Sequence, residues 1–267
     1  MDFYGALFGW TFDVGPEEYG RYTTCLLDGR AAAGLAPNPD PDATAFWWNV
    51  YLATGDCDGT ARRVTDAGGT LVQPPMDVMD QGRMALARDP VGAQFGLWQG
   101  RARVGCEVVN EPGALVRNDL VTPNPEPARA FYAAVFDFTL DGNQDLPGFD
   151  FTFLRRPDGH EVGGVMGVPD APASAWATTF EVADTDAVVA RAAAARTSPA
   201  SSSACEGGIC SDGQWQAKVS GPGGGSPHSH TWPPSGPLVL WYSRGGSGTS
   251  LPEVRGQRRG QVREPPP

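Results

Sequence analysis

The chain has 267 residues, of which 40% are hydrophobic, and a formal net charge of −11 at pH 7. An acidic surface repels phosphate backbones and anionic lipids, so nucleic acids and membranes are excluded as predicted partners and a small molecule is favoured. Because no apolar run reaches the length of a membrane span and no basic, then apolar leader is visible, the sequence predicts a cytoplasmic protein.

Residues with helical and strand-like patterns alternate along the first hundred positions. Apolar residues at helical spacing predict a helix over residues 2–12. Asp56 is placed to cap a second helix that ends at Gly68-Gly69, with Asp58 and Arg62 at the supportive i, i+4 spacing. Alternating or β-rich segments predict strands, with a Pro/Asp-rich loop at 37–42, over residues 22–27, 30–36, 47–54, 70–73, 82–88 and 93–99. The order helix, three strands, helix, three strands predicts a repeated βαβββ unit that lacks its first strand.

The opening segment returns later in the chain. Phe3–Asp13 (FYGALFGWTFD) reappears as Phe131–Asp141 (FYAAVFDFTLD), and Trp48 keeps its spacing on Trp176. Such self-similarity predicts a duplicated domain. The second copy supplies the missing opening strand at residues 114–121, followed by a helix that begins near the prolines of residues 124–127, and a further helix over 184–196.

The last part of the chain breaks this pattern. Residues 197–267 are rich in Gly, Ser, Pro and Arg and contain too few apolar residues to fold alone. The break falls inside a repeat unit, which suggests the hypothesis of a frameshifted or wrongly joined reading of the gene. The predicted organisation is a first domain without its opening strand (1–109), a linker (110–113), a second domain without its closing strands (114–196) and a disordered or aberrant tail (197–267).

Three features together carry a family resemblance: the Phe-Tyr helix, the Gly68-Gly69 helix end and the segment Arg88–Phe95 (RDPVGAQF). With these, the chain resembles the vicinal oxygen chelate superfamily of glyoxalase, bleomycin-resistance and extradiol-dioxygenase proteins, in a tandem two-domain form. The resemblance implies an α+β fold in which paired βαβββ units form a cupped sheet around a cavity.

Enzymes of that superfamily hold a divalent metal with His, Gln or Glu side chains. By resemblance, the positions of these ligands fall here on Asn49, Arg117, Ala177, Gly34, Gly164 and Gly96. None of these positions carries an ordinary ligand. Asn49 offers one neutral carbonyl oxygen, whereas divalent ions need three or four N or O ligands. No metal ligand and no cofactor are therefore predicted, and a divalent metal enters only if the protein is an enzyme of this superfamily.

Strand alternation places Trp47, Asn49 and Tyr51 on one face, and the polar members of this set favour the cavity side. No Ser or Cys nucleophile is accompanied by a plausible base, so no catalytic residue is predicted. The predicted ligand-binding residues are Trp47, Asn49, Tyr51, Arg83, Phe95, Trp98, Asn118 and Trp176.

The leading functional hypothesis is a metal-free protein that binds a small apolar or aromatic molecule in the cupped sheet, as bleomycin-resistance-type relatives sequester drugs. One alternative is a metal-dependent lyase, isomerase or dioxygenase of the same superfamily. Another is a defective or frameshifted gene product without activity. The unpaired sheet edges also leave a homodimer formed by strand exchange open.

Overall fold

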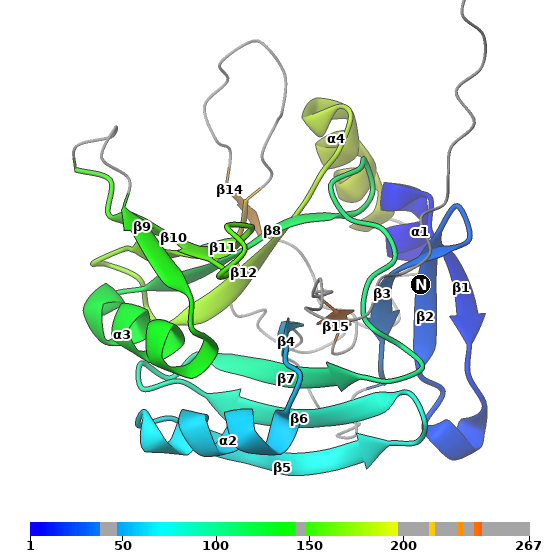
Figure 1. Cartoon of the computed structure of the whole chain (residues 1–267). Helices are drawn as coiled ribbons and strands as arrows, with labels where there is room; N and C mark the ends of the chain where they lie inside the picture. The colour runs from blue at the N-terminus through cyan, green and yellow to red at the C-terminus, as the bar shows by residue number, and fades with distance from the viewer. Residues whose placement is uncertain (38–46, 143–147, 197–213, 217–228, 232–237, 242–267) are drawn as a thin grey trace, which may run out of the picture.

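The computed structural model describes residues 1–37, 47–142, 148–196, 214–216, 229–231 and 238–241, and it has an α+β fold (Figure 1). The first part contains α1 (Asp2–Phe8), β1 (Thr11–Val14), the 3-10 turn η1 (Glu17–Tyr19), β2 (Thr23–Leu27), β3 (Arg30–Leu35), β4 (Trp48–Ala53), α2 (Cys57–Asp66), β5 (Thr70–Val78), β6 (Gly82–Arg88) and β7 (Gln94–Gly100). The second part contains β8 (Leu115–Thr122), α3 (Pro125–Phe136), β9 (Thr139–Gly142), β10 (Phe151–Arg155), β11 (Glu161–Gly167), β12 (Ala175–Phe180) and α4 (Thr185–Arg196).

The strands form an eight-stranded sheet in the order β1-β2-β3-β15-β4-β7-β6-β5 and a five-stranded sheet in the order β12-β8-β11-β10-β9. In each complete unit the first strand pairs in parallel with the last, β4 with β7 and β8 with β11. The predicted βαβββ architecture is therefore confirmed. No described helix combines the length and the hydropathy needed to cross a membrane.

The residues after α4 contribute short strands, β13 (Gln214–Gln216), β14 (Ser229–Thr231) and β15 (Leu238–Trp241). Strand β15 lies between β3 and β4, antiparallel to the former and parallel to the latter. In the two complete units, the corresponding neighbour of the last strand is the first strand of the same unit. The predicted tail otherwise lies outside the described residues, as does most of the loop predicted at residues 37–42.

Two local predictions differ from the structure. The helix predicted over residues 2–12 ends at Phe8, because Gly9 adopts φ +74° and caps it, and β1 follows instead. The strand predicted over 70–73 continues to Val78 through Pro74 and Pro75. Proline cannot donate a backbone hydrogen bond, and β5 tolerates both because it is the edge strand of its sheet. These prolines also protect the edge from pairing with another chain.

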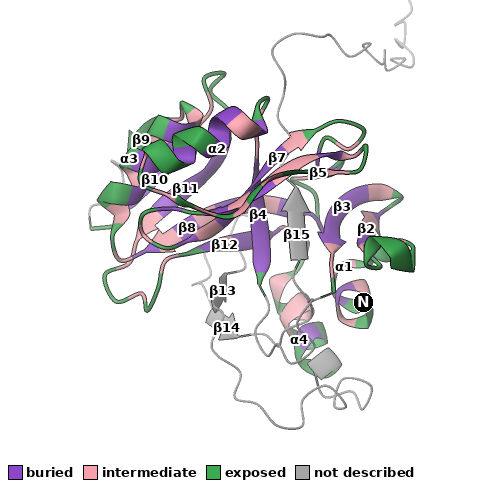
Figure 2. Cartoon of the chain, turned by 90° about the horizontal axis from the view of Figure 1, so that it is seen from below, coloured by how far each residue is buried: buried purple, intermediate pink, exposed green. Residues whose placement is uncertain are grey.

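The helices of the two parts contact each other, α2 with α3 and α1 with α4 (Figure 1). Helix α2 lies on β5, β6 and β7, and α3 lies on β9 and β11. One hydrophobic core consequently joins Val64 and Phe95 of the first part to Phe131, Leu154 and Val165 of the second. Buried residues, purple in Figure 2, run through β4 and β12, where the two sheets approach each other.

A buried hydrogen-bonded chain also crosses this core. Tyr132 on α3 donates through its hydroxyl to Asp89 Oδ2 (2.9 Å) and accepts from Trp176 Nε1 (3.0 Å). The other carboxylate oxygen of Asp89 accepts from the backbone N–H groups of Val91 (3.1 Å) and Ala93 (2.8 Å). Burial raises the pKa of Asp89 above its ordinary value. These hydrogen bonds link the turn between β6 and β7 to α3 and β12.

Candidate functional site

The segment after β7 covers part of the first sheet. We call residues 101–109 the strap. Trp98 Nε1 donates to the carbonyl of Arg103 (2.9 Å), and Glu107 forms two bonds with Ala31 on β3, one to its carbonyl (2.7 Å) and one from its N–H (2.7 Å). Tyr51 and Trp98 belong to a buried cluster separate from the core beneath α2, with 5% and 2% exposure. The strap therefore covers two of the predicted ligand-binding side chains.

Four other predicted ligand-binding residues lie in different surroundings. Asn49 is buried, and its Oδ1 accepts from Trp47 Nε1 (3.1 Å) and from Gln94 Nε2 (3.1 Å). Trp47 itself is 48% exposed. Phe95 and Trp176 face the helices within the shared core. The structure thus brings Trp47 and Asn49 together and separates them from Phe95 and Trp176.

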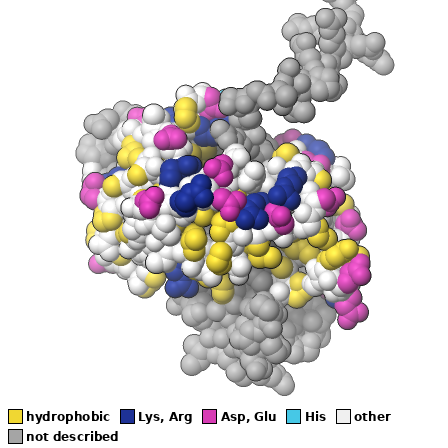
Figure 3. All heavy atoms as spheres, turned by 60° about the horizontal axis from the view of Figure 1, so that its bottom comes forward, with side chains coloured by type: hydrophobic (Ala, Val, Ile, Leu, Met, Phe, Trp, Pro, Cys, Tyr) yellow, Lys and Arg dark blue, Asp and Glu magenta, His cyan; other side chains and the backbone are white. Residues whose placement is uncertain are grey.

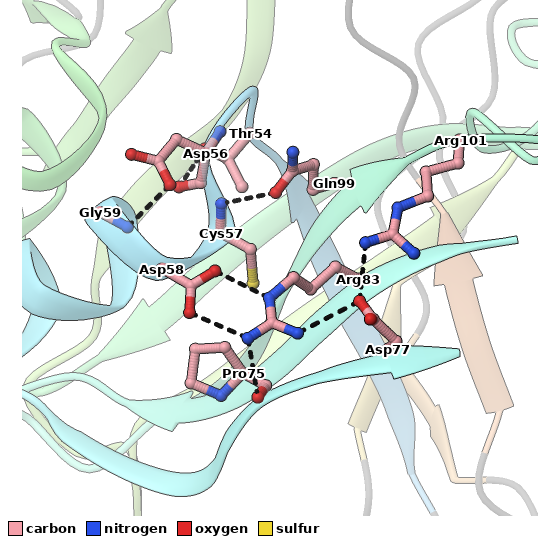
Figure 4. Close-up of polar contacts among 10 residues, drawn as sticks. All are labelled: Thr54, Asp56, Cys57, Asp58, Gly59, Pro75, Asp77, Arg83, Gln99 and Arg101. Atoms are coloured by element: carbon pink, nitrogen blue, oxygen red, sulfur yellow. Dashed lines mark hydrogen bonds and ion pairs between the residues drawn. The ribbon is translucent and has the colours of Figure 1, made fainter. Parts of the chain in front are cut away.

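Arg83 forms part of a charged network between α2, β5 and β6 (Figure 4). Its guanidinium donates to both carboxylate oxygens of Asp58 (2.7 and 2.9 Å) and to Asp77 (3.1 Å), which also pairs with Arg101 (2.7 Å). The hydrogen bonds from Arg83 lower the pKa of Asp58. Asp58, predicted to support Arg62, pairs with Arg83 instead because β6 presents a bidentate partner. Acidic and basic side chains accordingly lie side by side on the face shown in Figure 3.

A cavity of about 510 Å³ lies beside the second sheet, at the end where the parallel strands β8 and β11 begin. Its wall consists of residues 109–110 and 115–118, Arg156 in the β10–β11 turn, and residues 160–163. We call it the second-sheet cavity. This volume falls within the range of about 300–1,000 Å³ that is typical of small-molecule sites.

Irregular strand pairing shapes this cavity. The pairing of β8 with β12 skips Val116, and the pairing of β10 with β11 skips Val162. Both skipped residues line the cavity. Gly163 has φ +146°, and a Cβ there would lie 1.9 Å from the carbonyl oxygen of Asn118, so only glycine permits this approach of the strands. Bulges of this kind redirect side chains and recur beside functional sites.

Arg117 is held on several sides. Its Nε donates to both oxygens of Asp119 (2.7 and 2.7 Å), and its Nη1 donates to Glu161. The guanidinium also lies over the rings of Phe151 (4.8 Å) and Phe153 (5.3 Å), a favourable cation–π geometry. Its Nη2 is buried, and no described residue accepts a hydrogen bond from it. The wall therefore contains a donor nitrogen without an acceptor.

Asn118 follows directly in β8 and is only 3% exposed. Thr178 donates to its Oδ1 (2.8 Å), which fixes the orientation of the amide. No described residue accepts a hydrogen bond from its Nδ2, and the residue lines the cavity. Among the predicted ligand-binding residues, Asn118 is the member that the structure places in this wall. Arg117 is not one of these predicted residues: the resemblance assigns it to a metal position, although its charge within the apolar segment LVRNDLV is itself a signal of a functional residue.

The residues present do not fit the metal site that the resemblance describes. Three of its positions are glycines whose space is taken by an aromatic ring. A Cβ would lie 1.8, 2.3 and 2.1 Å from the nearest side-chain atom at Gly34 (Tyr22), Gly96 (Tyr51) and Gly164 (Phe151), respectively. In the part of the chain that the structure describes, no group of three or more His, Cys, Asp or Glu side chains is arranged to hold a metal ion.

Comparisons with known proteins agree with this architecture. The family described as the Glyoxalase/Bleomycin resistance protein/Dioxygenase superfamily matches residues 1–97. The "Putative glyoxylase CFP32" of Mycobacterium tuberculosis is 40% identical over 202 residues, which cover 72% of this chain and 76% of that protein. The "Anthracycline biosynthesis protein DnrV" of Streptomyces peucetius is 36% identical over 206 residues, covering 72% of this chain and 74% of that protein.

Solved structures with a similar arrangement include the Mn(II)-bound glyoxalase from Novosphingobium aromaticivorans. It has a TM-score of 0.48 at 15% identity and covers 89% of this chain and 76% of its own. The 2,2',3-trihydroxybiphenyl 1,2-dioxygenase from Sphingomonas wittichii has a TM-score of 0.47 at 14% identity, covering 90% and 83%.

Proposed function

We propose, from the premise that this chain belongs to the glyoxalase/bleomycin resistance protein/dioxygenase superfamily, that it binds a small apolar or aromatic molecule without a metal ion. We place the ligand in the second-sheet cavity. The observation that carries this proposal is the cavity itself, formed where two bulged strands begin and lined by both apolar and hydrogen-bonding groups.

The composition of the wall supports a ligand with an apolar body. Val116 and Val162 sit at the two bulges, and Leu115 and Val109 extend the apolar surface. Burial of such surface against a ligand stabilises the complex by about 25 cal/mol per Å² before the costs of association. The polar part of the wall, which would orient the ligand, comes from Asn110, Arg117, Asn118, Arg156, His160 and Glu161.

The names of the relatives agree with a small molecule as the ligand. One relative is named for a glyoxylase and another for anthracycline biosynthesis. Both names refer to small-molecule chemistry, and the proposal follows them only in this respect. The remaining predicted ligand-binding residues, Trp47, Asn49, Tyr51, Arg83, Phe95, Trp98 and Trp176, lie outside the cavity wall, so the proposal rests on Asn118 and its neighbours.

Filling the cavity is expected to abolish binding. Val116→Trp places an indole in the space that the ligand needs, and we expect the affinity for a naphthalene probe such as 2-ethylnaphthalene to fall at least about tenfold. Ligand-observed NMR titration measures this directly. Val121→Trp, on the same strand but outside the cavity wall, is the matched control and should retain binding. Equal binding by wild type and V116W would place the ligand elsewhere.

Metal removal is expected to leave the protein unchanged. Because the glycines at the family's ligand positions are covered by aromatic rings, EDTA should not shift the melting temperature or the affinity for 2-ethylnaphthalene. Elemental analysis of the purified protein, beside a thermal melt with and without EDTA, checks this. Near-stoichiometric metal together with a melting temperature lowered by EDTA would contradict the proposal and favour a metal-dependent enzyme.

A further inference from the structure

We propose that the ligand of the second-sheet cavity is uncharged and presents a carbonyl oxygen to Asn118. This inference rests on the small-molecule function proposed above and specifies the chemical class of the ligand. It follows from the hydrogen-bonding state of Asn118, from the balance of charges in the wall and from the apolar residues at the bulges.

The amide of Asn118 is prepared to donate. Because its Oδ1 is occupied by the hydroxyl of Thr178 (2.8 Å), the group left for a ligand is the Nδ2 amino group. The side chain is almost completely buried on a short strand segment between Arg117 and Asp119, so its position is well defined. No described residue accepts a hydrogen bond from this amino group, so a ligand oxygen with a free lone pair would give it an acceptor. Arg117 Nη2 in the same wall is a buried donor for which no described residue is an acceptor, and a ligand oxygen would remove that cost as well.

The cationic groups of the wall are already neutralised. Arg117 pairs with two carboxylates, Asp119 and Glu161. Arg156 pairs with Asp158 (2.5 Å). No described cation of the wall is therefore left without a carboxylate partner to balance an anionic ligand. A cationic ligand is disfavoured as well, because the unsatisfied groups of Arg117 and Asn118 are N–H donors. A neutral acceptor fits both conditions.

The other residues of the wall describe the rest of the ligand. The side chain of His160 is 75% exposed and points outward. The contacts to a ligand inside the cavity therefore come from the backbone next to His160 and from Val116 and Val162. Val116 and Val162, brought into the wall by the bulges, offer apolar surface for a flat or compact hydrocarbon body. The chemical class is thus a neutral ketone, quinone or lactone on an apolar ring system.

Three matched probes test this class on the full chain: 2-acetylnaphthalene, a neutral ketone; 2-ethylnaphthalene, its hydrocarbon counterpart; and 2-naphthoate, its anionic counterpart. We expect the ketone to bind at least about tenfold more tightly than either of the others, because the hydrocarbon lacks the acceptor oxygen and the carboxylate finds no unpaired cation in the wall. Titration of ¹⁵N-labelled protein should also shift the side-chain amide resonances of Asn118 with the ketone alone.

Asn118→Asp tests the donor, since it keeps an oxygen for Thr178 and replaces only the amino group. We expect it to weaken the ketone at least about tenfold and to leave 2-ethylnaphthalene unchanged. Asn124→Asp introduces the same charge outside the cavity wall while preserving Asn118, and is the matched control. Thr178→Val, which releases the amide orientation without adding charge, is the second variant if N118D proves unstable in a thermal melt, and should weaken the ketone selectively.

The outcomes separate the two proposals. If 2-ethylnaphthalene or 2-naphthoate binds as tightly as the ketone, or if N118D and T178V both leave ketone affinity unchanged, the inference about the ligand class is wrong while the small-molecule function stands. If none of the three probes binds the wild-type protein in a V116W-sensitive manner, the proposed function itself fails, and this inference with it.

Discussion

Replacing Tyr132 with Phe is expected to lower the free energy of unfolding by about 3–5 kcal/mol, a large part of the stability of an ordinary domain. The change removes one oxygen that serves two buried partners. Asp89 Oδ2 loses its donor and Trp176 Nε1 loses its acceptor, and each is left unsatisfied in the core. The loss is larger than that of one hydrogen bond because a carboxylate is among the stranded groups.

Chemical denaturation followed by tryptophan fluorescence measures this loss. Tyr19→Phe removes the same atom from a side chain that is 51% exposed in η1, so it should alter stability by no more than about 0.5 kcal/mol. Asp89→Asn provides an independent check, because its amino group would face the Tyr132 hydroxyl and leave that O–H without an acceptor. A Y132F variant as stable as Y19F would show that the buried chain contributes little.

Gly96→Ala is expected to destabilise the protein by about 1–3 kcal/mol, the range for overpacking a close-packed interior. The added methyl carbon would lie 2.3 Å from the ring of Tyr51. That ring cannot move away freely, because it is 5% exposed and packs with Trp98 beneath the strap. The strain should therefore spread to the strap and reduce the hydrogen-exchange protection of the Glu107 N–H, which bonds to Ala31.

A double-mutant cycle with Tyr51→Ala isolates the cause. If the clash with the ring is responsible, Gly96→Ala should cost little in the Y51A background, and the two changes should be non-additive by at least about 1 kcal/mol. Additive effects would mean that the cost of G96A comes from the backbone of β7 and not from the contact with Tyr51.

The duplicated architecture could be predicted because it depends on short-range patterns repeated along the chain. The capping of α2 by Asp56, whose Oδ1 accepts from the Gly59 N–H (2.9 Å), is local in the same way and is confirmed. The end of α1 was missed because the aromatic spacing continues to Trp10, whereas Gly9 already turns the backbone to positive φ. The length of β5 was missed because proline argues against a strand unless its edge position is known.

The candidate site was harder to predict because it depends on relations between strands. Alternation grouped Trp47, Asn49 and Tyr51 on one face, but no local pattern shows that the strap folds back over Tyr51. A bulge is likewise a mismatch between two partners, so neither the sequence around Val116 nor that around Val162 reveals it alone. Asn118 could be proposed from its own strand, whereas its unused amino group became apparent only with Thr178 in place.

The two copies pack against each other, because α2 and α3 share one core and α1 contacts α4. This packing limits how either copy can be exchanged in evolution. A copied gene segment is often portable, and its product can be moved, lost or exchanged on its own. Here each copy supplies the apolar surface that shelters the other from water. Recombination that replaced one copy alone would therefore have to preserve the helix faces that match the other copy.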